Sequence, residues 1–313
     1  MFAIISSFDV RWVCLLRFIE RQQVLKKNGL LRSTSLVSGN TVISRILGFL
    51  RDMIWAQIFG AGPAFDAFII AFKLPNFMRR LFAEGAFAQA FVPVLSQQQT
   101  TKSFPEVKQF IRHMSGTLSV ALVIAVIIGV LGASVLVDIF APGFVSGGAR
   151  HLLAVHLLQI TFPYLFFISL VALSGAILNT YGSYGVPSFT PVFFNVCLIL
   201  AAVYLAPKMA VPVVALAWGL LAAGVVQLVF QLPFLRQKKL LVMPQPSLSD
   251  PGVRRVLKLM VPALFGVSVA QVSILMDTLF ASFLPQGSIT WLYFSERLMN
   301  FPLGVVGVGI ATV

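Results

Sequence analysis

Residues 44–93 read SRILGFLRDMIWAQIFGAGPAFDAFIIAFKLPNFMRRLFAEGAFAQAFVP. This stretch is apolar enough for two membrane spans on either side of the break at Gly60–Pro63, yet it is also rich in charge. Its charged side chains are Arg45, Arg51, Asp52, Asp66, Lys73, Arg79, Arg80 and Glu84. A charge that faces lipid at mid-bilayer costs about 2.5–3.5 kcal/mol. We therefore expect these groups at the headgroup level or in a hydrated cavity lined by protein.

The whole chain has the composition of a polytopic membrane protein. Of its 313 residues, 58% are hydrophobic and 11% are charged, whereas soluble domains carry about 25% charged residues. The net charge of +13 does not indicate nucleic acid as a partner, because the lysines and arginines fall between apolar runs and form no basic module.

Motifs for catalysis and metal binding are missing from the sequence. The two cysteines are far apart, and the three histidines lack ligand spacing, so we predict neither a disulfide nor a metal site. The chain also lacks GxSxG, HExxH and P-loop motifs. The sequence therefore predicts a protein that is not an enzyme and that uses no cofactor.

Hydropathy divides the chain into about eight spans, which predicts an all-α membrane bundle. We expect a cytoplasmic leader over residues 1–30, a first lobe of six helices over 31–235, a polar linker over 236–258, and two further helices over 259–313. The first three predicted spans are about 35–59, 64–95 and 114–137. The turn cluster at 179–185 divides residues 157–207 into two more spans. The last three are about 211–235, 259–283 and one that begins near 288. Residues 96–113 and 138–156 are predicted connections.

Lysine and arginine counts in the connections predict the orientation. With the N-terminus in the cytoplasm, the inside connections hold Lys26, Lys27, Arg32, Lys102, Lys108, Arg112, Arg236, Lys238, Lys239, Arg254, Arg255 and Lys258, and the outside ones hold Arg150 and Lys208. Positive residues concentrate on the cytoplasmic side of membrane proteins. The N-terminus is therefore predicted to be cytoplasmic.

Helical projection gathers the charges of the second span on one face. At 100° per residue, Asp66, Lys73, Arg80 and Glu84 fall within about 40° of one another, although Pro75 makes this register approximate. One interpretation is that the charges are helix-end anchors and ion pairs, such as Arg80 with Glu84. The other interpretation is a cationic cavity that holds an anionic cargo. It follows from the excess of cations over carboxylates, which remains when Asp277, Glu296 and Arg297 are included. Arginine's planar fork suits phosphate oxygens.

Several motifs resemble one transporter family. They include Ser44–Asp52, Asp66–Phe68, Phe72–Asn76, Arg79–Phe87 and Arg297–Met299. The sequence is similar over about residues 29–313 to the MurJ (MviN) family, the lipid II flippases of the MOP exporter superfamily. The resemblance implies a MATE-like bundle of fourteen helices in two lobes around a cationic central cavity, of which this sequence holds the first lobe and the start of the second.

The resemblance also implies importance for transport at Arg45, Arg51, Asp52, Asp66, Arg79 and Arg297. Taken with the charge pattern, it predicts substrate binding at Arg45, Arg51, Arg79, Arg80 and Arg297, and gating or charge balance at Asp52, Asp66, Lys73, Glu84, Asp277 and Glu296. Family members often carry an acid three residues after the last arginine, where this chain has Asn300, and an ion-pairing role there is in doubt.

The implied function is transport of a lipid-linked cell-wall precursor. By resemblance, lipid II moves from the cytoplasmic to the periplasmic leaflet of the bacterial inner membrane by alternating access, with lipid II and membrane lipids as partners. We expect the 313 residues alone to be inactive, because alternating access requires two halves and the second half has only two predicted spans. A truncated reading frame would explain this, and so would a split transporter completed by a second chain. The alternatives are another MOP exporter, for polysaccharide repeats or for drugs and cations, and a non-transporting membrane scaffold.

Overall fold

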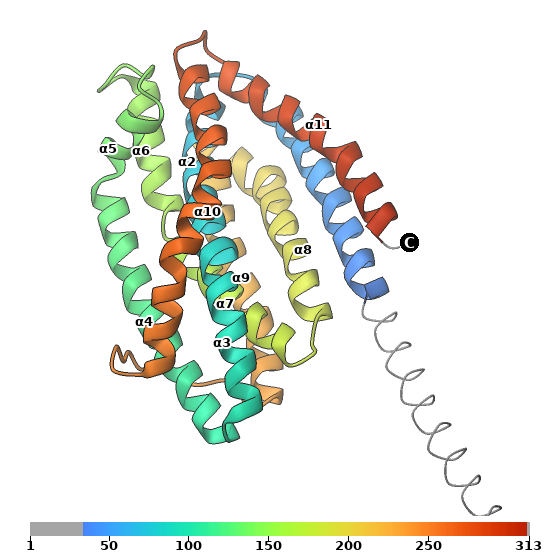
Figure 1. The fold of residues 1–313 in the computed structure, drawn as a ribbon. Helices are drawn as coiled ribbons and strands as arrows, with labels where there is room; N and C mark the ends of the chain where they lie inside the picture. The colour runs from blue at the N-terminus through green and yellow to red at the C-terminus, as the bar shows by residue number, and fades with distance from the viewer. Residues whose placement is uncertain (1–33, 312–313) are drawn as a thin grey trace, which may run out of the picture.

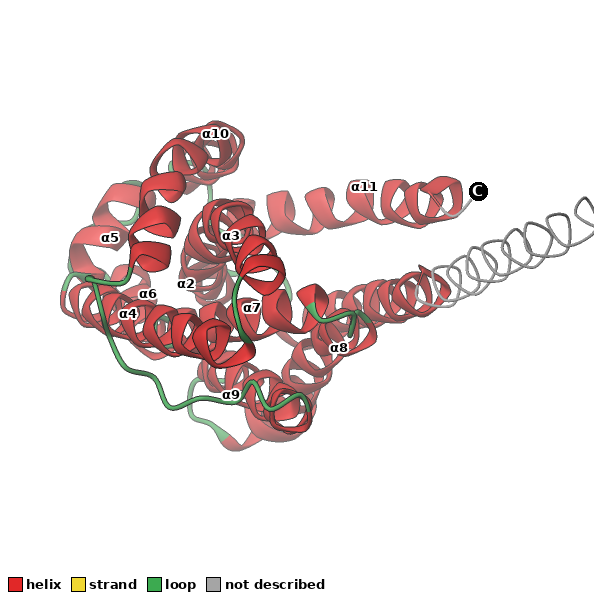
Figure 2. Ribbon diagram, turned by 60° about the horizontal axis from the view of Figure 1, so that its bottom comes forward, coloured by secondary structure: helices red, strands yellow, loops and turns green. Residues whose placement is uncertain are grey.

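The computed structural model describes the backbone of residues 34–311, and the predicted leader lies outside the described residues. The description also leaves out the side chains of residues 81–84, 267, 269–272, 274 and 300–311. The predictions for Glu84 and Asn300 therefore lie outside the described side chains. The described residues form helices joined by short connections, and no strand occurs among them (Figures 1 and 2). The predicted all-α fold class is confirmed.

Each predicted span contains a helix. After the helix over residues 34–59, the order is α2 (Pro63–Met78), η1 (Arg79–Phe87), α3 (Ala88–Thr101), α4 (Phe104–Leu131), α5 (Ala133–Phe140), α6 (Ala149–Thr161), α7 (Tyr164–Thr180), α8 (Gly185–Leu200), η2 (Ala201–Leu205), η3 (Ala206–Lys208), α9 (Val214–Gln237), α10 (Pro251–Ser282) and α11 (Ser288–Ala311). Within the part of the chain that the structure describes, four segments are long and apolar enough to cross a membrane: Phe104–Leu131, Ala149–Thr180, Gly185–Lys208 and Val214–Gln237.

Three predicted connections are shorter in the structure than in the sequence analysis. The helix predicted from Met114 begins at Phe104, because Ser103 and Glu106 form a capping box and Pro105 stands in the first turn. Helices reach into both sides of the 138–156 loop, which leaves residues 141–148 as the connection. Residues 251–258 are likewise helical, because Asp250 caps α10 and Pro251 starts it.

The connections alternate between two ends of the bundle (Figure 1). We call the end with residues 102–103, 181–184 and 238–250 the basic end, and the end with residues 60–62, 141–148 and 283–287 the far end. In the described residues, all the lysines and arginines of the predicted inside connections fall at or beside the basic end. The helix order thus agrees with the charge asymmetry in the sequence.

A proline inside α2 has a replacement hydrogen bond. Pro75 carries no N–H, so the carbonyl oxygen of Ala71 loses its usual helical donor. The hydroxyl of Thr161 on α6 donates to that oxygen at 2.9 Å. One turn later the helix widens into the π-helix η1 over Arg79–Phe87. The α-helical projection of the second span therefore does not apply beyond Met78, because a π-turn rotates the residues that follow it.

The linker at the basic end is fixed to α4. Its Gln245 N–H donates to the Arg112 carbonyl oxygen at 3.1 Å, and its Ser247 N–H donates to Thr117 Oγ1 at 3.2 Å. Gly116 permits this approach, because a Cβ there would overlap the backbone of Gln245 and Pro246. The start of α10 is thereby held against the first lobe.

Asp250 joins this linker to α4 and gives a pH-dependent prediction. Its carboxylate lies 2.8 Å from His113 Nδ1 and accepts from the N–H groups of Gly252 and Val253. Burial would raise the pKa of Asp250, but these hydrogen bonds outweigh it and lower the pKa. A lowered folded-state pKa stabilises the fold above the unfolded-state pKa of about 3.9, and that stability is lost as pH falls through the folded value.

We expect Asp250→Ala to reduce the free energy of unfolding by about 1 kcal/mol at pH 6, the usual value of a helix N-cap. The deficit should shrink as the pH falls through the lowered folded-state pKa of Asp250, because the wild-type carboxylate then becomes protonated. Denaturant unfolding in detergent at several pH values measures both effects. As a control, Asp250→Asn retains a capping acceptor and should keep most of the stability at pH 6. A loss of unfolding free energy for Asp250→Ala that is equal at all these pH values would contradict this account.

Candidate functional site: a cationic cavity

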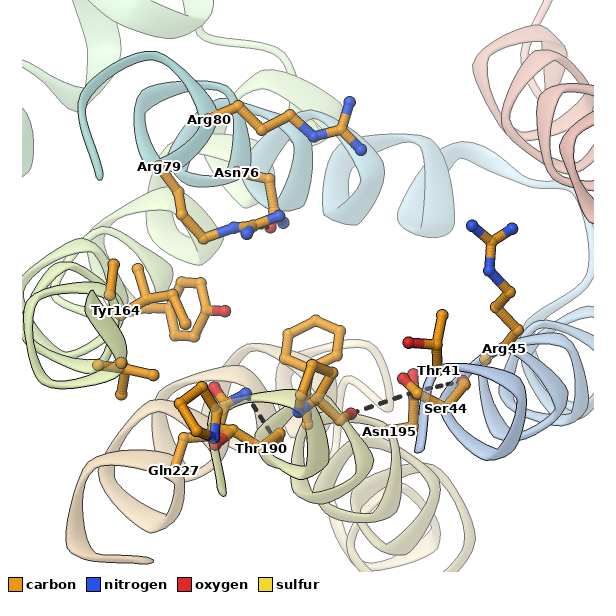
Figure 3. Close-up of a pocket in the computed structure, with 18 of the residues that line it drawn as sticks. Thr41, Ser44, Arg45, Asn76, Arg79, Arg80, Tyr164, Thr190, Asn195 and Gln227 are labelled. Carbon is orange, nitrogen blue, oxygen red and sulfur yellow. Dashed lines mark hydrogen bonds between the residues drawn. The ribbon is translucent and has the colours of Figure 1, made fainter. Parts of the chain in front are cut away.

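A cavity of about 1100 Å³ opens among the helices (Figure 3). Side chains from the helix over residues 34–59 and from α2, η1, α3, α7, α8, α9, α10 and α11 line it. Most of the charged residues singled out from the sequence are among them: Arg45, Arg51, Asp52, Lys73, Arg79, Arg80, Asp277, Glu296 and Arg297. Cations outnumber carboxylates in this described lining. The structure thus brings into one cavity charged residues that are up to 252 positions apart in the sequence, from Arg45 to Arg297.

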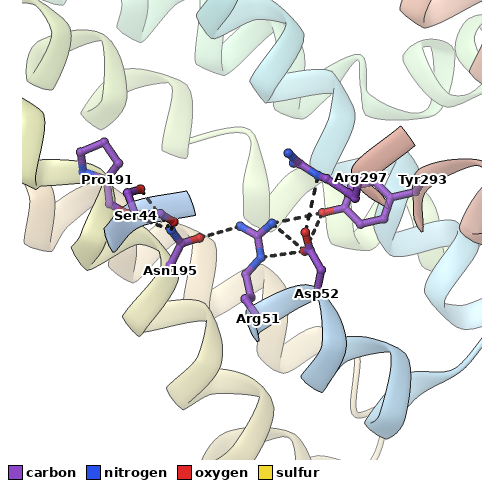
Figure 4. Close-up of polar contacts among 7 residues, drawn as sticks. All are labelled: Ser44, Arg51, Asp52, Pro191, Asn195, Tyr293 and Arg297. Carbon is purple, nitrogen blue, oxygen red and sulfur yellow. Dashed lines mark hydrogen bonds and ion pairs between the residues drawn. The ribbon is translucent and has the colours of Figure 1, made fainter. Parts of the chain in front are cut away.

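Arg51 and Asp52 form the centre of a buried polar cluster (Figure 4). Their residues are 3% and 7% exposed. Arg51 donates to Asp52 Oδ1 from Nη2 at 2.7 Å and from Nε at 3.0 Å, and Nη1 donates to Asn195 Oδ1 at 3.0 Å. The Arg51 guanidinium also stands 4.6 Å from the centre of the Trp55 ring. Arg51 thus directs its donors to other protein groups in this conformation.

Residues of α11 complete this cluster. Tyr293 Oη donates to Asp52 Oδ1 at 3.1 Å, and Arg297 Nε lies 3.7 Å from Asp52 Oδ2. The Arg297 side chain is 41% exposed, while that of Asp52 is 8% exposed. Asp52 therefore balances two arginines, and Arg297 is the one that faces the open part of the cavity.

Lys73 connects α2 to both later helices. Its Nζ donates to Thr278 Oγ1 on α10 at 3.0 Å and lies 3.5 Å from Glu296 Oε2 on α11. The predicted charge-balancing acid Glu296 thus contacts a predicted charge-balancing base. Asp277 lines the same part of the cavity and is exposed.

Arg79 and Arg80 stand on the wall formed by α2 and η1, and Arg45 stands on another wall (Figure 3). Arg79 Nε donates to Asn76 Oδ1 at 3.3 Å, which helps to orient the guanidinium across the cavity. Arg80 is exposed and Arg79 is half-buried. These arginines, with Arg297, are placed to meet an anion within the cavity.

Asp66 is placed apart from the other predicted site residues. It lies at the far end, is fully buried, and does not belong to the cavity lining. Its carboxylate accepts from Gly287 N at 2.7 Å, and from Thr290 N and Oγ1 at 2.9 and 2.7 Å, while Arg150 Nη1 lies 3.7 Å away. Asp66 thus holds the start of α11 against α2.

Several cavity residues were missed by the sequence analysis. Asn195 and Tyr293 hold Arg51, and Thr190, Gln227 and Gln231 form an uncharged polar wall. Gln227 and Gln231 are four residues apart in an otherwise apolar span. That spacing places two amides on one face, a signal for an interior-facing surface.

The solved structures that match this chain define the class of protein. The arrangement of helices matches an outward-facing multidrug resistance MATE family transporter of the MOP superfamily, with a TM-score of 0.57 and 16% identity, over 90% of this chain and 63% of the other. It also matches a structure described as "Lipid II flippase MurJ, inward closed conformation", with a TM-score of 0.73 and 30% identity, over 86% of this chain and 55% of the other. The chain has the fold of MOP-superfamily transporters.

Sequence comparison identifies the family. The family profile described as "Lipid II flippase MurJ" matches residues 55–313. A protein of Vibrio cholerae named "Probable lipid II flippase MurJ" is 50% identical over 298 residues, 93% of this chain and 57% of that protein. The "Lipid II flippase MurJ" of Burkholderia cenocepacia is 44% identical over 288 residues, 91% of this chain and 56% of that protein. The chain belongs to the MurJ family, and it spans a little over half the length of these relatives.

Proposed function

We propose that this chain forms the substrate-binding part of a lipid II flippase in the bacterial inner membrane. The cavity with surplus cations carries the proposal, because the exposed Arg80 and the half-buried Arg79 and Arg297 suit the pyrophosphate of a lipid-linked precursor. Charge asymmetry supports a cytoplasmic basic end and a periplasmic far end. Movement between leaflets would follow from alternating access around this cavity.

The contacts support distinct roles for the charged residues. Arg45, Arg79, Arg80 and Arg297 would bind the substrate's phosphates, whereas Arg51 shares its donors with Asp52, Asn195 and Tyr293 and would keep the other cations in position. Asp52, Lys73 and Glu296 would balance charge within the cavity. Asp66 would act on the gate at the far end.

Binding in detergent tests the proposal. We expect the purified chain to bind lipid II, and Arg79→Gln to weaken that binding about 10- to 100-fold, because a hydrogen bond to a charged group contributes about 1.5–3 kcal/mol. Arg255→Gln is the matched control, since Arg255 is exposed on α10 near the basic end and does not line the cavity.

The same binding assay also tests the alternative function, export of drugs or cations. A drug or cation exporter would bind tetraphenylphosphonium and ignore lipid II, and that result for the wild type would overturn the proposal. Equal weakening by Arg79→Gln and Arg255→Gln would show that general surface charge, and not the cavity, attracts the lipid.

A further inference from the structure

One wall of the cavity is polar but uncharged. It consists of Thr190 on α8 with Gln227 and Gln231 on α9, and we call these three residues the amide wall. They are 2%, 3% and 1% exposed. Figure 3 shows Thr190 and Gln227 across the cavity from Arg79 and Asn76. The cavity therefore has a cationic side and a neutral side.

Hydrogen bonds fix the orientation of both glutamine amides. Gln227 Nε2 donates to the Thr190 carbonyl oxygen at 3.2 Å, and an acceptor of this kind requires the nitrogen to face it. Gln231 Nε2 donates to Thr190 Oγ1 at 2.9 Å. That hydroxyl already gives its only hydrogen to the Val186 carbonyl at 2.9 Å, so it too must accept. Neither amide is able to flip without placing two acceptors together.

This arrangement leaves two acceptors without a donor. Gln227 Oε1 and Gln231 Oε1 are buried and have no hydrogen-bond partner among the described residues. A buried unsatisfied acceptor costs about 1–3 kcal/mol. An apolar side chain of similar size would pack against α7 and α8 without that cost. The unpaired oxygens are therefore unfavourable for folding alone, and their place in the cavity lining suggests a use for them.

We propose that Gln227 and Gln231 accept hydrogen bonds from hydroxyl or amide N–H groups of a sugar attached to the substrate's phosphate. This inference rests on the proposed function and extends it: cationic donors bind the anionic part of the substrate, and amide acceptors bind its neutral part. A ligand that offers only acceptors would gain nothing at this wall. Both oxygens are covered in this conformation, so binding requires the groups that cover them to move aside, while the hydrogen bonds from Nε2 to Thr190 hold each amide in place.

The test compares two lipids, of which one carries a disaccharide with its peptide and the other carries neither. The wild-type chain in detergent is titrated with undecaprenyl pyrophosphate and with lipid II, which adds the disaccharide and peptide. We expect lipid II to bind more tightly. Gln227→Met and Gln231→Met should each reduce the ratio of the two dissociation constants about tenfold while leaving the affinity for undecaprenyl pyrophosphate unchanged.

Two controls separate binding from folding. Gln159→Met makes the same change on α6 at an exposed position outside the cavity lining, and it should leave the ratio unchanged. The melting temperature of the two wall variants should stay equal to the wild-type value or rise, because each removes an unsatisfied acceptor. If a methionine variant fails to fold, Gln231→Asn retains the amide but shortens its reach, and it should also lower the ratio.

The outcomes distinguish this inference from the function beneath it. A wild-type preference for lipid II that all the wall variants retain would overturn the inference and leave the proposed function standing, with the oxygens bound to water only. Equal affinity of the wild type for both lipids would overturn the inference in the same way. Binding of neither lipid to the wild type would overturn both.

Discussion

Asp52→Ala is expected to reduce the free energy of unfolding by about 3–5 kcal/mol, the usual cost of removing one partner of a buried ion pair. Arg51 is 3% exposed, and its Nε and Nη2 both donate to the Asp52 carboxylate. Alanine leaves that buried guanidinium without its counter-charge. It also removes the acceptor for Tyr293 Oη and the carboxylate that balances the charge of Arg297. Denaturant unfolding of the purified variant in detergent measures the loss.

The matched control is Asp277→Ala in the same cavity. Asp277 is an exposed carboxylate of the lining, and its removal should cost less than about 1 kcal/mol. The double variant Arg51→Met with Asp52→Leu should recover most of the stability, because it leaves neither half of the pair behind. Equal losses for Asp52→Ala and Asp277→Ala would refute the claim that the Arg51–Asp52 pair is structurally central.

Sequence alone was sufficient to predict the division into helices. Apolar runs of membrane length end at breakers such as Gly60–Pro63 and the 179–185 cluster, and these signals are local. The cost of charge in lipid was also sufficient to predict that charges of residues 44–93 lie at the headgroup level or in a cavity lined by protein, because this argument requires no knowledge of which helices pack together. Arg45, Arg51, Asp52, Lys73, Arg79 and Arg80 do line such a cavity, whereas Asp66 does not.

The partners of those charges could not be predicted, because long-range packing determines them. Arg51 meets Asn195 and Tyr293, which are 144 and 242 residues away. Thr161, which lies on a separate helix, donates to the Ala71 carbonyl oxygen that Pro75 leaves without a donor. The sequence places a proline in the second span, but no local rule states which neighbour supplies the missing donor.

The position of Asp66 shows a limit of helical projection. A projection gives the angle of a side chain around the helix axis and ignores its height. Asp66 and Lys73 share an angle, yet seven residues of α-helix separate them by about 10 Å along the axis. That distance is enough to place Lys73 in the cavity lining and the buried Asp66 beyond it, at the far end.

We expect Asp66→Asn to favour opening of the far end. In the wild type, the carboxylate accepts hydrogen bonds from the N–H of Gly287, just before α11, and from the N–H and the hydroxyl of Thr290 in its first turn. Anions are stabilised at helix N-termini. The asparagine amide lacks the charge, and its Nδ2 replaces an acceptor with a donor. A loss of about 2–4 kcal/mol is expected, which corresponds to about a 30- to 1000-fold shift in the equilibrium between the closed and open states.

A buried cysteine reports this opening. Ile289, beside the Asp66 contacts, is 1% exposed, and Ile289→Cys in a background with Cys14 and Cys197 replaced by alanine gives one thiol near the gate. Its labelling by a polar thiol reagent should become at least about 30-fold faster with Asp66→Asn, because labelling requires the open state. The matched control is Asp138→Asn, since the Asp138 side chain is 44% exposed at the same end and contacts Ser146 and His151. Labelling that stays slow with Asp66→Asn, or accelerates equally with Asp138→Asn, would show that Asp66 does not hold the gate closed.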